Sequence, residues 1–506
     1  MRCTLAILAL AGQATAEPAF VDRSADLPVR HVYGGGWEYF VGGGVAVFDC
    51  NGDTRPDLLA AGGENPARLF VNETGGPGEP LRFVLGDIGE RAGVTGAYPL
   101  DIDADGILDL VVLRVGPNII LKGDGACGFT DATADFAVDP GDHWSTSFSA
   151  TWEPGQSRPT LVVGNYVDRS DPDGPFEACD ANQIYRPIGP RYAKPVDLEP
   201  GFCALSMLIS DWRRAGEPEL RISNDRHYYI RGGYEQMWRL DPLSERSASD
   251  GWAKVSLWGM GIASGDITGD GLPEVMLTSM GDQLLQFNEG GRFRNAPFEI
   301  GTYAQRPHVG DDGRPSTGWH AEFGDVDNDG LLDLFIAKGN VDQMPSNAIH
   351  DPNNLLMQQP DGTFVERAAV AGIATGERSR GAALADFDGD GRLDVVVVNR
   401  RAPLELWQNV TDSAGNWATV DLRDRGPNTR GVGSWIEVRT DAGVQAVEVT
   451  VGGGHAGGQA GPVHFGLGEA GEAEVRVIWP DGGQTDWITV PANAPVKVTR
   501  EGPTPG

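Results

Sequence analysis

The sequence predicts an all-β protein made of a seven-bladed β-propeller followed by a small β-rich domain. A nine-residue motif rich in aspartate recurs through the larger part of the chain, and each copy precedes a short apolar run, rich in β-branched residues in the clearest copies. Neighbouring copies start about 50 to 60 residues apart, which is close to the length of one four-stranded blade. The 71 glycines and 34 prolines among 506 residues also suit a chain with many turns.

The clearest copy of the motif is "DFDGDGRLD", which starts at Asp386 and has aspartate at positions 1, 3, 5 and 9. Four carboxylates this close repel one another, so we expect a cation among them. Oxygen ligands at alternate positions of a tight loop suit Ca²⁺, which accepts six to eight oxygens, including a backbone carbonyl. We therefore predict about five Ca²⁺ sites, one in each copy, with the side chains of positions 1, 3, 5 and 9 and the carbonyl of position 7 as ligands. The predicted ligands are Asp49, Asn51, Asp53, Arg55 and Asp57; Asp101, Asp103, Asp105, Ile107 and Asp109; Asp266, Thr268, Asp270, Leu272 and Glu274; Asp325, Asp327, Asp329, Leu331 and Asp333; and Asp386, Asp388, Asp390, Arg392 and Asp394.

An EF-hand loop also begins with alternating aspartates, but it needs a glutamate at position 12 and a helix on each side. Position 12 is apolar in every copy, and the flanking runs predict strands. A simple hairpin turn would explain one such loop. Five copies with matching flanks favour the metal-binding interpretation.

Two degraded copies bring the number of repeats to seven. "WEPGQSRPTL" starts at Trp152 and "DWRRAGEPEL" at Asp211, both in the long gap between the second and third clear copies. In the latter we expect Arg213 to replace the ion by bridging Asp211 and Glu219, because a guanidinium can meet two carboxylates. The seventh repeat lacks its last strand, whereas "AFVDRSA" at residues 19–25 matches "TFVERAA" at the end of the sixth. We therefore expect the N-terminal segment to complete the last blade.

The repeats resemble the FG-GAP (VCBS-type) calcium-binding repeats of seven-bladed propellers such as integrin α heads, and "EFGDVDNDG" retains the Phe323-Gly324 pair. From residue 411 the chain changes character. "VTVGGGHAGG", "HFGLGEA" and "VRVIWPDGG" resemble the ASPIC/UnbV domain, which follows such propellers in the cartilage acidic protein family and its bacterial relatives. The resemblance implies a propeller over residues 17–410 and a β domain over residues 411–506.

The N-terminal segment, residues 1–16, has one arginine, a short apolar run and a small-residue site ending at Ala16, as in a secretory signal peptide. We therefore expect a secreted, periplasmic or extracellular protein. Four cysteines follow, and they permit three pairings. We favour Cys179 with Cys203, which lie in one long insertion, and Cys50 with Cys127.

The net charge of −32 argues against nucleic acid as a partner, and no later apolar run is long enough to span a membrane. The sequence contains no zinc-ligand spacing, nucleophile elbow or phosphate-binding loop. The prediction is a non-enzymatic, calcium-binding scaffold for an extracellular protein or glycan. The alternative is a polysaccharide lyase or hydrolase that uses aromatic and histidine residues of "GGWEYF", "GDHWSTS", "SNDRHYY" and "STGWHAE" on the loop face.

Overall fold

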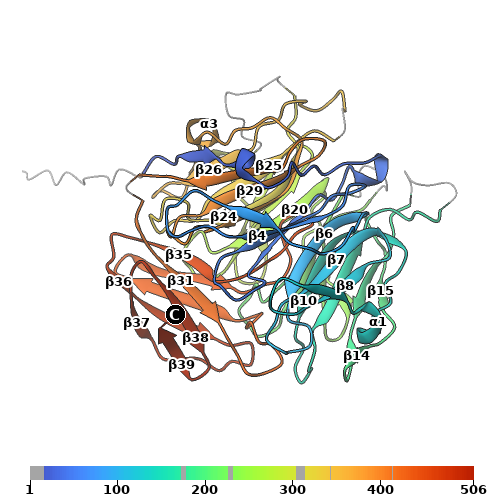
Figure 1. Cartoon of the computed structure of the whole chain (residues 1–506). Helices are drawn as coiled ribbons and strands as arrows, with labels where there is room; N and C mark the ends of the chain where they lie inside the picture. Colours follow the sequence, from blue (N-terminus) through green and yellow to red (C-terminus); the bar gives the residue numbers. More distant parts are fainter. Residues whose placement is uncertain are drawn as a thin grey trace, which may run out of the picture.

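The computed structural model describes residues 16–171, 178–225, 232–303, 314–341, 344–412 and 414–505. Almost all the regular structure is β (Figure 1). The predicted signal peptide lies outside the described residues except for Ala16.

In the described part of the chain, seven antiparallel units of four strands form the blades of a propeller, which confirms the predicted fold class. Pairing of β10 with β7 joins the units of blades 2 and 3 into one sheet. Blades are numbered in chain order, and the strands of each blade run from the innermost to the outermost. Blade 1 has β2 (Val45–Phe48), β3 (Asp57–Ala60), β4 (Arg68–Asn72) and β5 (Phe83–Leu85); blade 2 has β6 (Val94–Leu100), β7 (Asp109–Gly116), β8 (Ile119–Gly123) and β9 (Phe129–Asp131). Blade 3 has β10 (His143–Thr151), β11 (Thr160–Asn165), β12 (Asn182–Tyr185) and β15 (Val196–Leu198), with the small hairpin β13 (Pro187–Ile188) and β14 (Arg191–Tyr192) inserted.

The remaining blades follow the same plan. Blade 4 has β16 (Ala204–Ser210), β17 (Glu219–Asn224), β18 (Gln236–Arg239) and β19 (Ser244–Glu245); blade 5 has β20 (Gly259–Gly265), β21 (Glu274–Ser279), β22 (Leu284–Asn288) and β23 (Phe293–Asn295). Blade 6 has β24 (Gly318–Gly324), β25 (Asp333–Lys338), β26 (Asn354–Gln358) and β27 (Phe364–Glu366); blade 7 has β28 (Ser379–Ala385), β29 (Asp394–Asn399) and β30 (Glu405–Asn409). Two four-residue helices, α1 (Thr133–Phe136) and α3 (Ala368–Ala371), follow the outer strands of blades 2 and 6.

The seven innermost strands contact one another in order, and β28 returns to β2, so that the ring is closed. The second strands are buried along their whole length, apart from the half-buried Arg114 and Val115 of β7, because each blade is covered by its neighbours on both faces. Every residue of β29, for example, is buried, which explains the unbroken apolar run "DVVVV" in the sequence.

The N-terminal segment completes blade 7, as predicted. Strand β1 (Phe20–Asp22) pairs with β30, with Phe20 opposite Asn409 and Asp22 opposite Trp407. The last blade is thus held by residues from both ends of the propeller. The two predicted disulfides, Cys50–Cys127 and Cys179–Cys203, are also present, and the first joins blades 1 and 2.

The C-terminal strands form two sheets that pack face to face beside the propeller (Figure 1). Their shared core contains Phe465, Trp479 and a set of buried valines. The first sheet has β31 (Asn416–Leu422), β35 (Val463–Gly468), β38 (Ala494–Thr499) and β39 (Gly502–Pro505), and the second has β32 (Trp435–Thr440), β33 (Gly443–Glu448), β36 (Glu472–Ile478) and β37 (Ile488–Pro491).

One segment of this C-terminal part leaves its own sheets and enters the propeller. Residues 450–461, here called the glycine finger, connect β33 to β35. Within it, β34 (Gln459–Ala460) pairs in parallel with β2 of blade 1. Bridges to the innermost strands of blades 2 to 5 join Ala97 to Gly457, Ala150 to Val451, Leu208 to Gly452 and Ile262 to Gly454.

Candidate metal centres

The five clear motif copies all connect the innermost strand of a blade to its second strand, in blades 1, 2, 5, 6 and 7. In every blade the innermost strand runs in the same direction across the ring, so the loop that follows it emerges at the same face. The five loops therefore lie on one face of the ring. This face is called the metal-loop face below.

The acid at position 9 anchors each loop to its blade. In blade 7, the Asp394 carboxylate accepts the backbone N–H of Phe387 at 2.9 Å and that of Asn409, on the third strand, at 2.8 Å. The corresponding acids Asp57, Asp109, Glu274 and Asp333 each accept two equivalent N–H groups. Burial raises the pKa of Asp394 well above its ordinary value.

The acid at position 1 folds the loop around itself. In all five copies it accepts the N–H of position 6, at 2.7 to 2.9 Å. Position 6 has a positive φ, for example 87° at Gly391 and 92° at Gly330, which explains the glycine of the motif. Blade 1 has Thr54 at this position with φ 72°, a conformation that disfavours a β-branched residue.

The described residues bring the acids of positions 1, 3 and 9 together in three of these loops. In blades 2, 6 and 7, one oxygen from each of these acids lies within 4.8 Å of the others, in a geometry that could hold a metal ion. The three groups are Asp101, Asp103 and Asp109; Asp325, Asp327 and Asp333; and Asp386, Asp388 and Asp394.

The blade 6 loop shows most directly that a cation fits. Asp327 is 1% exposed, and neither of its carboxylate oxygens has a hydrogen-bond partner among the described residues. Burial, together with the nearby Asp329, raises the pKa of Asp327 to about 7. Asp325 and Asp333, also buried, have pKa values raised well above the ordinary range. Buried oxygens without partners are costly, and a bound cation would satisfy them.

The loops of blades 1 and 5 are built differently. Asn51 and Asp53 of blade 1 are exposed, and the group that includes Asp57 there contains the sulfurs of the Cys50–Cys127 disulfide. In blade 5, Thr268 takes position 3. Among the described residues, neither loop gathers three carboxylates as the other three loops do.

A lysine that the motif does not reveal enters the blade 2 loop. Lys122, on the third strand of that blade, contacts Asp103 and lies 2.8 Å from Asp105. These two carboxylates raise the pKa of Lys122. Its ammonium group therefore competes with a metal ion for two of the predicted ligands.

The degraded loop of blade 4 differs from our expectation. Arg213 contacts Glu217 at 3.0 Å and approaches Glu219 at 3.9 Å, but Asp211 is held by the backbone N–H groups of residues 215–217. Glu219 instead receives the Nε–H of Arg246 at 2.7 Å, from beyond the outer strand of the blade. The predicted bridge is wrong because Glu219 is already held by Arg246 and by the indole N–H of Trp212 at 2.8 Å, while Asp211 is held by backbone N–H groups.

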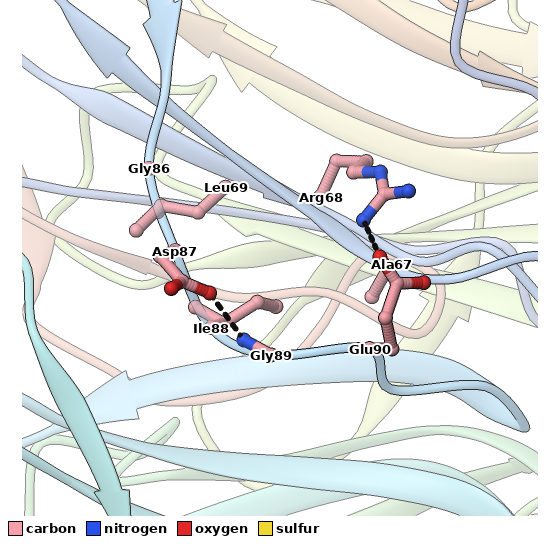
Figure 2. Close-up of a pocket in the computed structure, with 8 residues that line it drawn as sticks. All are labelled: Ala67, Arg68, Leu69, Gly86, Asp87, Ile88, Gly89 and Glu90. Carbon is pink, nitrogen blue, oxygen red and sulfur yellow. Dashed lines mark hydrogen bonds and ion pairs between the residues drawn. The ribbon is translucent and has the colours of Figure 1, made fainter.

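The aromatic and histidine segments that we considered as a ligand site belong largely to the core. Trp144 and Trp319 are fully buried, and His320 contacts the glycine finger. His227 of "SNDRHYY" lies outside the described residues. The hollow shown in Figure 2 encloses about 110 Å³ beside β4, lined by residues 67–69 and 86–90, which is well below the volume of a typical ligand pocket.

Comparison with known proteins agrees with this description. A family described as FG-GAP-like repeat matches residues 49–112, 266–336 and 325–397, and the family ASPIC and UnbV matches residues 424–505. Cartilage acidic protein 1 from Mus musculus is 24% identical over 490 residues, covering 87% of this chain and 70% of that protein. The Homo sapiens protein is 22% identical over 487 residues, covering 87% and 69%.

Among solved structures, the BP39L lectin from Burkholderia pseudomallei aligns with a TM-score of 0.45 and 13% identity, covering 75% of this chain and 98% of the lectin. BBS1N, from its complex with ARL6DN, aligns with a TM-score of 0.43 and 10% identity, covering 78% and 98%. The family matches and the relatives lead to one conclusion. The chain carries FG-GAP-like repeats and a C-terminal ASPIC/UnbV domain, and over most of its length it is similar to cartilage acidic protein 1.

Proposed function

We propose that this protein is a secreted binding or adhesion scaffold whose propeller is stabilised by Ca²⁺ in the loops of the metal-loop face. The observation that carries the proposal is Asp327, a buried carboxylate without a partner among the described residues, inside a group of three acids. The ligands would be the side chains at positions 1, 3, 5 and 9 of each loop and the carbonyl of position 7. Bound Ca²⁺ would neutralise charges that otherwise repel one another.

The donor set favours calcium over other metals. Every side-chain donor of the blade 6 and blade 7 groups is a carboxylate oxygen. Zinc in proteins is bound mainly by cysteine and histidine, whereas Ca²⁺ takes oxygen ligands in flexible loops. The N–H groups donated to positions 1 and 9 orient these carboxylates.

Secretion is supported by the two disulfides, since such bonds persist mainly in oxidising compartments. Calcium is also abundant there. Among the described residues, no helix is long and apolar enough to cross a membrane. An extracellular protein or glycan would be the partner, and the net charge of −32 favours a cationic one. The enzymatic alternative gains no support, because Trp144 and Trp319, two of the residues it relied on, are buried.

Metal content tests the proposal directly. The purified protein is stripped with a chelator, dialysed, and titrated with Ca²⁺ by calorimetry, with elemental analysis of the bound metal. We expect several Ca²⁺ ions per chain, and one fewer in Asp327→Asn. Asp441→Asn, at an exposed position of the C-terminal domain, is the control and should bind as the parent does. A chain that binds no Ca²⁺ at millimolar concentration would disprove the calcium part of the proposal.

The scaffold part needs a separate measurement. Calcium-loaded protein is applied to arrays of acidic and neutral glycans and of basic extracellular proteins, and each glycan is also assayed for new reducing or unsaturated ends. Binding without product formation is the expected result. Turnover of any glycan would contradict it.

A further inference from the structure

We propose that calcium in the metal loops is coupled to the seating of the glycine finger, so that loaded loops hold the C-terminal domain on the propeller and the finger in its central channel. The inference rests on the proposed calcium binding. It adds that the metal sites control the association of two parts of the chain.

The finger makes hydrogen bonds with strands around the inside of the ring. The N–H groups of Gly453, Gly454 and Gly458 donate to the carbonyls of Met207, Ile262 and Ala97, at 2.7, 2.6 and 3.2 Å. These acceptors lie on the innermost strands of blades 4, 5 and 2. The backbone N–H of Val47, in blade 1, donates to the carbonyl of Gly458 at 3.1 Å. The finger thus fills the channel around which the blades are arranged.

The tip of the finger is the fully buried His455. Its Nδ1–H donates to the carbonyl of Met260 at 3.0 Å, and its Nε2 accepts the N–H of Gly42 at 3.2 Å. The ring also packs against Trp319, with centroids 5.0 Å apart. These contacts hold His455 as a neutral imidazole between Met260 of blade 5 and Gly42, just before blade 1.

The channel wall and the finger are complementary because both lack side chains where they meet. A Cβ atom on Gly44 or on Gly96 would lie 1.8 Å from the carbonyl oxygen of Ala456. A Cβ atom on Gly457 would lie 2.1 Å from the carbonyl oxygen of Val45. These distances leave no room for a methyl group, so the seated position is sterically specific.

The domain that carries the finger is docked on the metal loops themselves. In blade 2, the hydroxyl of Thr429 donates to Asp101, a predicted ligand, at 2.6 Å. In blade 6, the N–H groups of Gly415 and Gly468 donate to the carbonyls of Asp327 and Asn328, both at 2.8 Å.

Blade 7 repeats the arrangement. His464 donates from Nε2 to the carbonyl of Gly391, within the loop, at 3.0 Å. A Cβ atom on Gly391 would lie 1.9 Å from the indole nitrogen of Trp417, so this loop and the first C-terminal strand are in close contact. The three loops that gather three carboxylates are therefore all contacted by the C-terminal domain.

The coupling follows from this geometry. Without a cation, the carboxylates of a loop repel one another and favour an open loop, which would displace the carbonyls and the carboxylate that the C-terminal domain contacts. By thermodynamic reciprocity, contacts that favour the closed loop must also increase its calcium affinity. Docking and loading should therefore strengthen each other.

Hydrogen exchange on the full-length chain tests the coupling. Exchange of the amides of residues 453–458 is followed in excess Ca²⁺ and in excess chelator, and bound Ca²⁺ is measured in parallel. We expect these amides to exchange at least about tenfold faster in chelator. The amides of the β32–β36 ladder, inside the C-terminal domain, are the control and should change much less.

The effect of the C-terminal domain contacts on calcium affinity is tested with a conservative substitution. Thr429→Val removes the hydrogen bond to Asp101 without altering a ligand, and we expect the calcium affinity of that loop to fall about fivefold or more. Thr489→Val, at an exposed position of β37, is the matched control.

A second variant, Gly457→Val, should displace the finger from the channel, and we expect it to weaken calcium binding in several loops. Its control is Gly461→Val, where nothing lies within 4 Å of the added Cβ atom.

The outcomes separate the two proposals. If the chain binds no Ca²⁺, the proposed function fails, and the coupling fails with it. If the chain binds Ca²⁺ but the finger amides exchange equally in both conditions and Thr429→Val binds as the parent does, the coupling alone is overturned. Should Gly457→Val fail to fold, the exchange measurement and Thr429→Val still decide the question.

Discussion

The backbone N–H of His455 donates a hydrogen bond to Nδ1 of His320, on the innermost strand of blade 6, at 3.1 Å. His320 therefore carries its proton on Nε2, which lies 3.2 Å from a carboxylate oxygen of Glu322. This contact joins the finger tip to a blade not reached by the backbone bridges. The finger is thus fixed by side-chain as well as backbone groups.

Acid should destabilise the seated finger through His455. Burial, with Arg380 and His320 nearby, lowers the pKa of His455 to about 3. Because the folded pKa lies below the unfolded value of about 6.5, the unfolded state binds more protons than the folded state once the pH falls below about 6.5. From pH 7 to pH 5 the free energy of unfolding should fall by about 2 kcal/mol from this residue.

Denaturant unfolding in saturating Ca²⁺, at several pH values, measures this effect. His455→Gln should have a shallower dependence on pH between 7 and 5 than the parent. His350→Gln, at an exposed histidine, serves as the control. Equal slopes for the parent and His455→Gln would show that the buried ring does not titrate as expected.

Removal of calcium should lower the melting temperature strongly. A ligand that binds only the folded state adds about 2.7 kcal/mol per site at one hundred times its dissociation constant. Several sites would therefore contribute an amount comparable with the whole stability of a domain, about 5 to 15 kcal/mol. Calorimetry with and without a chelator measures this, with elemental analysis to confirm removal. An unchanged melting temperature in metal-free protein would contradict the prediction.

The loops should fill in a definite order. That of blade 6 should hold Ca²⁺ most tightly, because it offers four carboxylates, three of them already gathered, whereas in blade 7 the guanidinium of Arg392 contacts Asp390. Blades 1 and 5, with Asn51 and Thr268 at position 3, should empty first. Crystals grown at limiting Ca²⁺ would show the occupancies. Higher occupancy in blades 1 and 5 would reverse our ordering.

Blade 2 should be intermediate because of Lys122. Removing the competing ammonium group in Lys122→Met should raise the calcium affinity of that loop, while Lys254→Met, outside the metal-loop motifs, should not. Calorimetric titration measures both variants. A weaker affinity in Lys122→Met would mean that the lysine organises the loop rather than competing with the ion.

A methyl group in the channel wall should destabilise the protein. In Gly96→Ala the new atom would meet the carbonyl oxygen of Ala456 at 1.8 Å, so the finger or the strand must move. Overpacking of this kind costs about 1 to 3 kcal/mol. Gly461→Ala, where nothing lies within 4 Å of the new atom, should be nearly neutral. Thermal denaturation of the two variants distinguishes a tight channel from one that accommodates the methyl group.

The degraded loop of blade 4 should depend on Arg246 rather than on Arg213. Glu219 is 3% exposed and pairs with Arg246, which is 8% exposed. Arg246→Ala removes the nearest cation from the buried Glu219 and leaves it the indole N–H of Trp212 at 2.8 Å and the more distant Arg213 and Arg239, so the loss should approach but not exceed the roughly 3 to 5 kcal/mol of a broken buried pair. Arg213→Ala should have a much smaller effect, because its closer partner Glu217 is exposed. Both effects should persist in the presence of a chelator, and a larger loss in the Arg213 variant would restore our original expectation.

The propeller and the local geometry of its loops can be predicted from the repeated motif alone. Each loop is closed by hydrogen bonds between residues five and seven apart, such as Gly391 to Asp386 and Phe387 to Asp394, so the spacing of the motif encodes its shape. The recurrence of the motif at the spacing of one four-stranded blade then indicates the number of blades. The match between residues 19–25 and 363–369 revealed how the ring closes, because homologous strands occupy equivalent places.

The neighbours of these loops, in contrast, come from distant parts of the chain and are known only from the folded structure. Thr429 and Asp101 are 328 positions apart in the chain, and Arg246 reaches Glu219 from a segment outside the motif. The glycine finger has no regularly spaced apolar residues that would mark it as part of the core, because its contacts are made by backbone groups. Its place depends on the width of a channel that exists only after seven blades have closed around it, so no local pattern could predict it.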